Sequence, residues 1–180
     1  MGHNLENTTA LLARTPRALD ALLRDLPEFW TLGTEGGSSW SPFEVVAHLI
    51  HGEKTDWIPR AKIILESGDA RTFDKFDMGG HAAEMQGKSI GQLLDEFAAL
   101  RAKSLDELKA LNLKPSDMER RGRHPVFGPV TLSQLLATWA GHDLTHLHQI
   151  SRILAGQYRE EVGPWSAFLG VLHCGGHSSV

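Results

Sequence analysis

Residues 131–150, TLSQLLATWAGHDLTHLHQI, show the clearest pattern in this sequence. Their apolar residues recur at the three- and four-residue spacing that is typical of an amphipathic helix. Within this segment His142 and His146 are four residues apart. One turn of helix therefore places both imidazoles on the apolar face. We expect this helix to be part of the core and to direct two histidines into the protein interior.

Two imidazoles at this spacing can bind one divalent metal ion through their Nε2 atoms. The alternative is that each is a core histidine whose ring nitrogens are satisfied by hydrogen bonds. We favour the metal, because two histidines at ligand spacing are less often structural than one. Asp143 stands where the zinc-protease pattern HExxH has its general-base Glu, and its shorter side chain argues against a metalloprotease. We expect His148 to lie on another face, at the surface or supporting the site.

The composition is that of an ordinary globular domain: 180 residues, 41% hydrophobic, 22% charged, with a net charge of −4. We predict one domain over residues 1–180. The charge gives no reason to expect nucleic acid or an acidic membrane surface as a partner. Cys174 is the single cysteine, which excludes an internal disulfide. Without a signal-peptide pattern or a long apolar run, we expect a cytoplasmic protein with no membrane span.

The hydrophobic periodicity and the capping signals predict four long helices. We expect Asn7 or Thr8 to cap the first helix, with Pro16 either kinking it or following a new cap at Thr15. Pro59 should bend or end the second. The predicted ranges are 7–25, 42–67, 90–111 and 132–156, with caps at Ser41, Ser89 and Thr131 for the last three.

Long connections separate these helices. Residues 67–89 form a polar connection whose length suggests an ordered loop that covers something. In the second connection, 112–130, we expect the arginines at 120, 121 and 123 to form a solvated turn and residues 125–130 to pair briefly as a strand or hairpin. Residues 165–172, WSAFLGVL, predict a short apolar helix that covers the core or a partner. The fold class is therefore all-α: a four-helix bundle with long crossover connections and a short C-terminal helix.

A catalytic site of this type commonly has three protein ligands and an open position. On the second helix His48 and His51 are both candidates, and the helical wheel leaves the choice open, with His48 nearer to the apolar arc. Glu53 lies close to that arc as well. It is a candidate oxygen ligand or supporting residue, although an exposed residue paired with a neighbour is the simpler interpretation.

The segments WSPFEVVAHL at 40–49 and GHDLTHLHQI at 141–150, in this order, resemble the DinB-like proteins, also called the DinB/YfiT superfamily. The resemblance extends from the first helix to about residue 155. It implies a four-helix bundle in which His48, His142 and His146 bind a divalent metal ion. Zinc or nickel is the expected ion, and manganese is a further candidate. The connection 67–89 and the tail after Gly163 are not prescribed by the family motif.

The resemblance also implies either a metal-dependent hydrolase or a transferase that uses a low-molecular-weight thiol. A metal held by three neutral imidazoles can lower the pKa of bound water to about 7 or hold a thiolate. Asp143 and Glu53 are the candidate catalytic residues, as a general base or as partners of an imidazole. Because neither is a strong candidate base, we favour thiol chemistry as the mechanism.

Other interpretations remain open. The protein could be a non-catalytic, stress-associated bundle whose metal is structural. A second metal site in the tail, with His173, Cys174 and His177, is less favoured because flexible ends bind metals adventitiously. A small-molecule substrate is the expected partner, and the family resemblance implies a homodimer.

Overall fold

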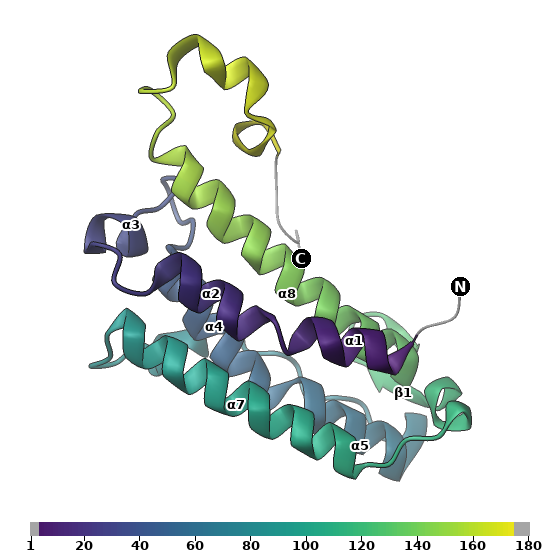
Figure 1. Cartoon of the computed structure of the whole chain (residues 1–180). Helices are drawn as coiled ribbons and strands as arrows, with labels where there is room; N and C mark the ends of the chain where they lie inside the picture. The colour runs from purple at the N-terminus through teal and green to yellow at the C-terminus, as the bar shows by residue number, and fades with distance from the viewer. Residues whose placement is uncertain (1–3, 175–180) are drawn as a thin grey trace.

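The computed structural model describes residues 4–174, which form a bundle of four helical arms (Figure 1). The arms are α1 (Leu5–Leu12) with α2 (Thr15–Leu23), α4 (Pro42–Thr55) with α5 (Trp57–Ser67), α7 (Ile90–Ala110) and α8 (Leu132–Gly156). The shorter elements are α3 (Glu28–Leu32), η1 (Gly68–Ala70), α6 (His81–Glu84), η2 (Pro115–Glu119), β1 (Arg121–His124), β2 (Gly128–Thr131), η3 (Gly163–Phe168) and η4 (Gly170–Leu172). The predicted four-helix bundle is confirmed.

The three later arms begin where the capping signals predict. Each N-cap side chain accepts a hydrogen bond from the third helical residue, whose side chain accepts one in return from the N-cap backbone. This reciprocal capping box satisfies donors that the first turn of a helix leaves unpaired. The caps are Ser41, Ser89 and Thr131.

The first arm differs from the prediction at both of its helix starts. Asn4, and not Asn7 or Thr8, caps α1 by accepting a hydrogen bond from the backbone of Asn7 at 2.9 Å. The arm breaks after Leu12, and Thr15 is the first residue of α2 rather than its cap. The hydroxyl of Thr15 does not cap the helix but donates to the buried carboxylate of Asp143 at 2.5 Å.

The second arm breaks at Asp56, so that Pro59 lies in the first turn of α5. A proline there has no effect on the hydrogen bonds within the helix, since the first amides of a helix have no partner in it. This agrees with the predicted interruption.

The connection 112–130 contains a two-stranded antiparallel hairpin. Arg121 pairs with Thr131 and His124 with Gly128. Arg121 and Arg123 therefore belong to a strand, and the predicted solvated turn is wrong at these two positions. The hairpin also holds the other long connection, because the backbone of Phe73 donates to the carbonyl of Arg123 at 2.9 Å.

The order of the arms around the bundle is not their order in the sequence. The first arm packs against α7 through α2 and against α8 through α1, and the second arm also contacts both α7 and α8. The first and second arms do not pack closely on each other, nor do α7 and α8, so the connections 24–41 and 111–131 are crossovers, whereas the second arm and α7 are direct neighbours (Figure 1). Within the described part of the chain, no helix has both the length and the apolar character to cross a bilayer.

The core consists of two hydrophobic clusters. One surrounds Trp57 and Trp139, and the other surrounds Val46 and Phe97. Burying this apolar surface at about 25 cal/mol per Å² supplies the main stabilisation of the bundle. Polar side chains lie buried among these core residues, and they include His48, Glu53, Asp143 and His146, while His142 is half-buried.

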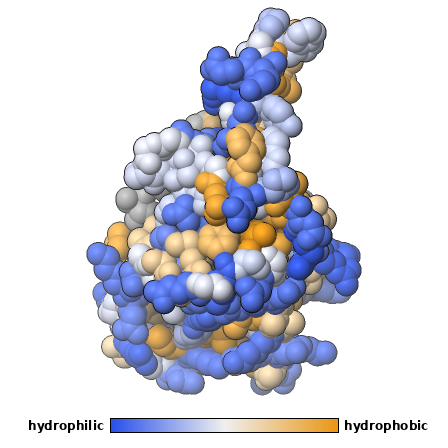
Figure 2. Space-filling model, turned by 90° about the vertical axis from the view of Figure 1, so that its left-hand side faces the viewer, coloured by the Kyte–Doolittle hydropathy of each residue, from blue (hydrophilic) through white to orange (hydrophobic). Residues whose placement is uncertain are grey.

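The C-terminal segment rises beyond the end of the bundle (Figures 1 and 2). The predicted short helix is present as the 3₁₀ segments η3 and η4. Trp165 is 69% exposed and Phe168 is 86% exposed, so neither covers the core of its own chain. Figure 2 shows apolar surface in the middle of this end of the bundle, surrounded by hydrophilic side chains.

Candidate metal centre

Three imidazoles from two distant segments converge inside the bundle. His48 comes from α4, and His142 and His146 come from successive turns of α8. The Nε2 atom of His142 is 3.2 Å from that of His48 and 3.0 Å from that of His146. His48 and His146 are only 4% and 5% exposed. Each of the three offers one ligand atom, and these atoms all lie within 4.8 Å of one another.

The geometry and charge state of the three rings fit a shared metal ion. Two nitrogens bound to one ion at about 2.0–2.1 Å are separated by about 2.8–3.4 Å for angles between octahedral and tetrahedral. Burial first, and then the neighbouring rings of His146 and His48 and the guanidinium of Arg101, lower the pKa of His142 to about 2. His142 is therefore neutral at physiological pH, which is the form that binds a metal.

The structure brings His48 to the pair on α8 and places His51 elsewhere. The ring of His51 packs edge-on against Phe76, with ring centroids 5.1 Å apart, and lies directly under the backbone of Gly80. Its Nε2 atom is buried without a hydrogen-bond partner among residues 4–174. The two candidates, three residues apart on α4, therefore have different environments: the metal centre for His48 and the covering loop for His51.

Gln149 is a residue of the site that the sequence reasoning missed. Its side-chain oxygen is 2.8 Å from Nδ1 of His146, and the side chain is buried. The signal was available, because Gln149 follows His146 by three residues on the same helix face.

Glu53 is part of a buried ionic cluster around Arg101. One carboxylate oxygen, Oε1, accepts hydrogen bonds from Nε and Nη2 of Arg101 at 3.1 and 2.8 Å. The same oxygen accepts a third from the indole N–H of Trp139 at 2.9 Å. The guanidinium is 1% exposed and the Glu53 side chain 0% exposed. Glu53 is thus neither solvent-exposed nor paired with a sequence neighbour.

Asp143 forms the other half of this cluster. It accepts hydrogen bonds from Nη1 and Nη2 of Arg101 at 2.6 and 2.9 Å, and from the hydroxyl of Thr15 at 2.5 Å. Nη1 also donates to the carbonyl of Leu12 at 2.8 Å, which is free because α1 ends there. Burial alone would lower the pKa of Arg101, but its bonds to Asp143 and Glu53 outweigh burial and raise it.

The ionic cluster bears on the catalytic roles predicted for Asp143 and Glu53. Both carboxylates are bonded to Arg101, and no hydrogen bond described for residues 4–174 joins either one to an imidazole. The guanidinium therefore competes with any proton that these carboxylates would accept. The cluster anchors α8 to α4 and α7 directly beside the metal centre.

Residues from two connections cover the metal centre. The ring of Trp40 is 4.9 Å from that of His48 and 4.6 Å from that of His81. Phe76 packs edge-on against His48 with centroids 5.4 Å apart. The segment 71–89 therefore lies over the imidazoles, as the length of this connection suggested.

Two lysines hold the covering segment to the bundle. Lys54 of α4 bonds to Glu84 of α6 at 2.6 Å and to Glu96 of α7 at 2.8 Å. Lys88, at the end of the segment, bonds to Glu96 at 2.5 Å. These ion pairs are partly exposed, so we expect them to be weak individually and sensitive to salt.

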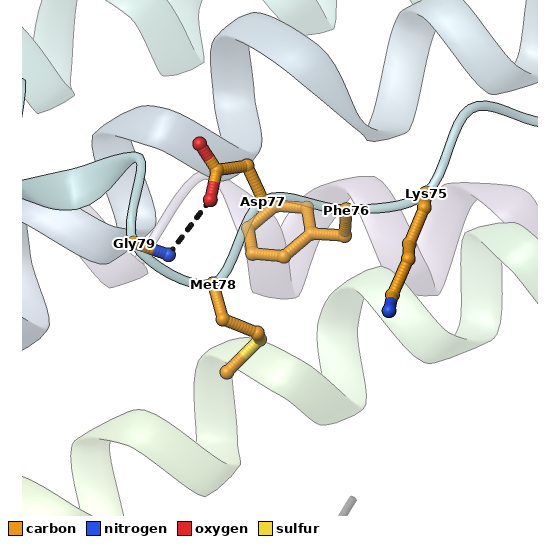
Figure 3. Close-up of a pocket in the computed structure, with 5 residues that line it drawn as sticks. All are labelled: Lys75, Phe76, Asp77, Met78 and Gly79. Atoms are coloured by element: carbon orange, nitrogen blue, oxygen red, sulfur yellow. Dashed lines mark hydrogen bonds between the residues drawn. The ribbon is translucent and has the colours of Figure 1, made fainter.

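A pocket of about 420 Å³ opens in the covering segment and is lined by residues 75–79. Figure 3 shows Lys75 and Met78 projecting to the same side of the loop, while Asp77 turns back to accept a hydrogen bond from the backbone of Gly79 at 2.9 Å. Phe76 lines this pocket and also contacts His48. Phe76 therefore belongs both to the lining of this pocket and to the cover of His48.

Within residues 4–174, His173 and Cys174 of the candidate tail site belong to no group of three possible metal ligands. His173 bonds to the carbonyl of Ser166 at 2.7 Å, and the sulfur of Cys174 is 3.1 Å from Nε2 of His148. His177 lies outside the described residues. His148 points to the surface, as its position two residues after His146 predicted.

Comparison with known proteins gives the family and the fold. Residues 11–150 match the family model of the DinB superfamily. The structure is similar to that of YfiT from Bacillus subtilis, described as a probable metal-dependent hydrolase with an unusual four-helix bundle topology. The two chains are 17% identical with a TM-score of 0.70, over 87% of each chain. It is also similar to TT2238, described as a four-helix bundle protein, with 19% identity and a TM-score of 0.50 over 82% of this chain and 98% of that one. No curated protein matches the sequence.

Proposed function

This chain belongs to the DinB superfamily, and on that premise we propose that His48, His142 and His146 bind one divalent metal ion that activates a nucleophile. The convergence of the three Nε2 atoms supports this proposal most directly. Zinc and nickel are the expected ions, because imidazole nitrogen suits both, and manganese is a weaker candidate. Bound there, the ion would keep its full positive charge and lower the pKa of a water or thiol at an open position.

We propose further that the nucleophile is a low-molecular-weight thiol, which the protein transfers to a small electrophile. The arrangement of the carboxylates supports this choice. A water nucleophile needs a base to take its proton, but Glu53 and Asp143 are both engaged by Arg101. A thiol has a much lower pKa than water and needs no such base.

Hydrolysis is the second candidate function. It is supported by the description of the similar structure, YfiT, as a probable metal-dependent hydrolase. In this case Glu53 would be the candidate to assist, through the carboxylate oxygen Oε2, which is buried without a hydrogen-bond partner in the described part of the chain.

The aromatic residues that cover the metal centre would exclude bulk water from it. Trp40 and Phe76 cover one side of His48, and Trp57 packs edge-on against His142 with ring centroids 5.1 Å apart. We propose that a small substrate reaches the site beside Phe76, through the pocket at residues 75–79. Excluding bulk water there would protect a reactive thiolate from competing reactions.

The test compares two reactions on the same metal-loaded protein. Thiol consumption is followed with glutathione, bacillithiol or mycothiol and an electrophilic acceptor, and hydrolysis is followed with a panel of small esters and amides. We expect thiol-dependent turnover that is lost in His142→Ala. Ester or amide turnover without a thiol would favour the hydrolase. Metal binding without any turnover would favour a structural metal in a non-catalytic, stress-associated bundle.

A further inference from the structure

The three imidazoles of the metal centre are not held in the same way. Nδ1 of His146 lies 2.8 Å from Oε1 of Gln149, one turn further along α8. Gln149 is 1% exposed, so water does not compete for this hydrogen bond. By contrast, Nδ1 of His142 is buried with no hydrogen-bond partner among residues 4–174.

This contact determines which nitrogen of His146 carries the proton. A neutral imidazole has one N–H and one lone pair, and an amide oxygen only accepts hydrogen bonds. Nδ1 of His146 must therefore be the donor to Gln149, which leaves the lone pair on Nε2. Nε2 is the atom that faces His142 at 3.0 Å.

We propose that Gln149 is a positioning residue that fixes His146 in the tautomer able to bind the metal, before any metal arrives. This inference rests on the proposed metal site. A metal-binding histidine commonly donates a hydrogen bond from the ring nitrogen that does not bind the metal, and Gln149 is the acceptor for His146. Because the tautomer and the ring orientation of His146 are already set, metal binding loses less free energy to ordering this imidazole.

The acceptor for His146 is the neutral amide of Gln149 and not a carboxylate, and this affects the charge at the site. A carboxylate at this position would make the imidazole more basic and would add a negative charge beside the site. Gln149 orients His146 without adding charge, which leaves the positive charge of the ion available to the nucleophile. Replacing it with Glu should therefore preserve the orientation and strengthen metal binding.

The first measurement needs no metal. Two-bond ¹H–¹⁵N correlations of the metal-free protein distinguish the two neutral tautomers of each histidine. We expect His146 to be the Nδ1–H tautomer in the wild-type protein and in Gln149→Glu. In Gln149→Leu, which fills the space without an acceptor, we expect a mixture of tautomers or the Nε2–H form.

The second measurement is the affinity for Zn²⁺ and Ni²⁺ by competition with a chromophoric chelator. We expect Gln149→Leu to bind each ion about 10- to 100-fold more weakly, which is the usual effect of losing such a partner. Gln149→Glu should bind at least as tightly as the wild-type protein. Gln134→Leu is the matched control, because it removes the capping partner at the start of the same helix and changes stability without touching the site.

The proposal is overturned if Gln149→Leu keeps the Nδ1–H tautomer and the wild-type affinity while only its melting temperature falls. It is also overturned if wild-type His146 is the Nε2–H tautomer, which would mean that the amide group faces it with its NH₂. A wild-type protein that binds neither ion would overturn the proposed function. The tautomers of the metal-free variants would then still decide whether Gln149 orients His146.

Discussion

Arg101 of α7 and Asp143 of α8 are joined by two hydrogen bonds of 2.6 and 2.9 Å in the interior of the bundle, where each side chain is 1% exposed. The same guanidinium binds Glu53 of α4 and the carbonyl of Leu12. One buried cation thus connects all four arms at the level of the metal centre. Its contribution is best measured by removing it.

Replacing Arg101 with Leu should lower the free energy of unfolding by about 3–5 kcal/mol, because it leaves two buried carboxylates without a compensating charge. Urea denaturation of the purified variant measures this change. Arg24→Leu is the control, since Arg24 also bonds to two carboxylates, Asp20 and Asp95, but at the surface. We expect little change there. Equal effects of the two substitutions would show that the buried cluster does not anchor the arms.

Removing the metal should lower the melting temperature without unfolding the protein. The imidazoles are held by packing and by Gln149, so the bundle does not depend on the ion to bring them together. An ion present at about 100 times its Kd stabilises by about 2.7 kcal/mol, which corresponds to about 5–11 °C for a domain of this size. Thermal melts with and without a chelator give the shift, and His142→Ala should show none. Complete unfolding on chelation would instead indicate a structural metal.

A methyl group on Gly80 should loosen the covering segment. The Cβ of an alanine at this position would lie 2.3 Å from Cε1 of His51, far closer than two carbons can approach. Because the ring of His51 also packs on Phe76, we expect the segment 71–89 to shift and its amides to exchange faster with deuterium.

Gly79→Ala is the matched control for this substitution, since its Cβ would meet only Oδ1 of Asp77, at an ordinary 3.5 Å. Hydrogen exchange followed by mass spectrometry compares the two variants peptide by peptide. Identical exchange over residues 71–89 would contradict the close packing of this segment on α4.

We expect the protein to pair as a homodimer, as the family resemblance implies, and the exposed aromatic residues of the C-terminal segment are the best candidates for the interface. Trp165 and Phe168 together present a large apolar surface to solvent. Light scattering after gel filtration should show that Phe168→Ser shifts the population towards monomer. Phe127→Ser, which removes another exposed ring, 72% exposed, from the hairpin turn, should not. A monomeric wild-type protein, or equal effects of both substitutions, would contradict this interface.

The features that could be predicted from the sequence are those that depend on residues close together in the chain. The caps at Ser41, Ser89 and Thr131 follow from residues three positions apart, and the structure has all three. The pair His142 and His146 follows from the helical period alone. The histidine of the second helix did not. His48 lies outside the centre of the apolar arc and His51 lies further towards the polar side, so the wheel favours His48 only weakly and cannot show what each one meets across the bundle.

The buried ionic cluster could not be predicted, since it depends on contacts between distant segments. Arg101 lies in a helix rich in charged residues, where exposure is the ordinary expectation. Its burial requires the break after Leu12, Glu53 from one arm and Asp143 from another. Thr15 illustrates the same point: its sequence position suggests a helix cap, but a buried carboxylate on α8 takes its hydroxyl.

The most direct test of the metal centre is an anomalous difference map at the metal absorption edge, from crystals of protein purified without added metal. We predict one peak per chain within bonding distance of Nε2 of His48, His142 and His146, with an open position on the side of Phe76. No peak between these three rings after soaking with zinc or nickel, or a peak bound instead by His51 or Cys174, would contradict the account.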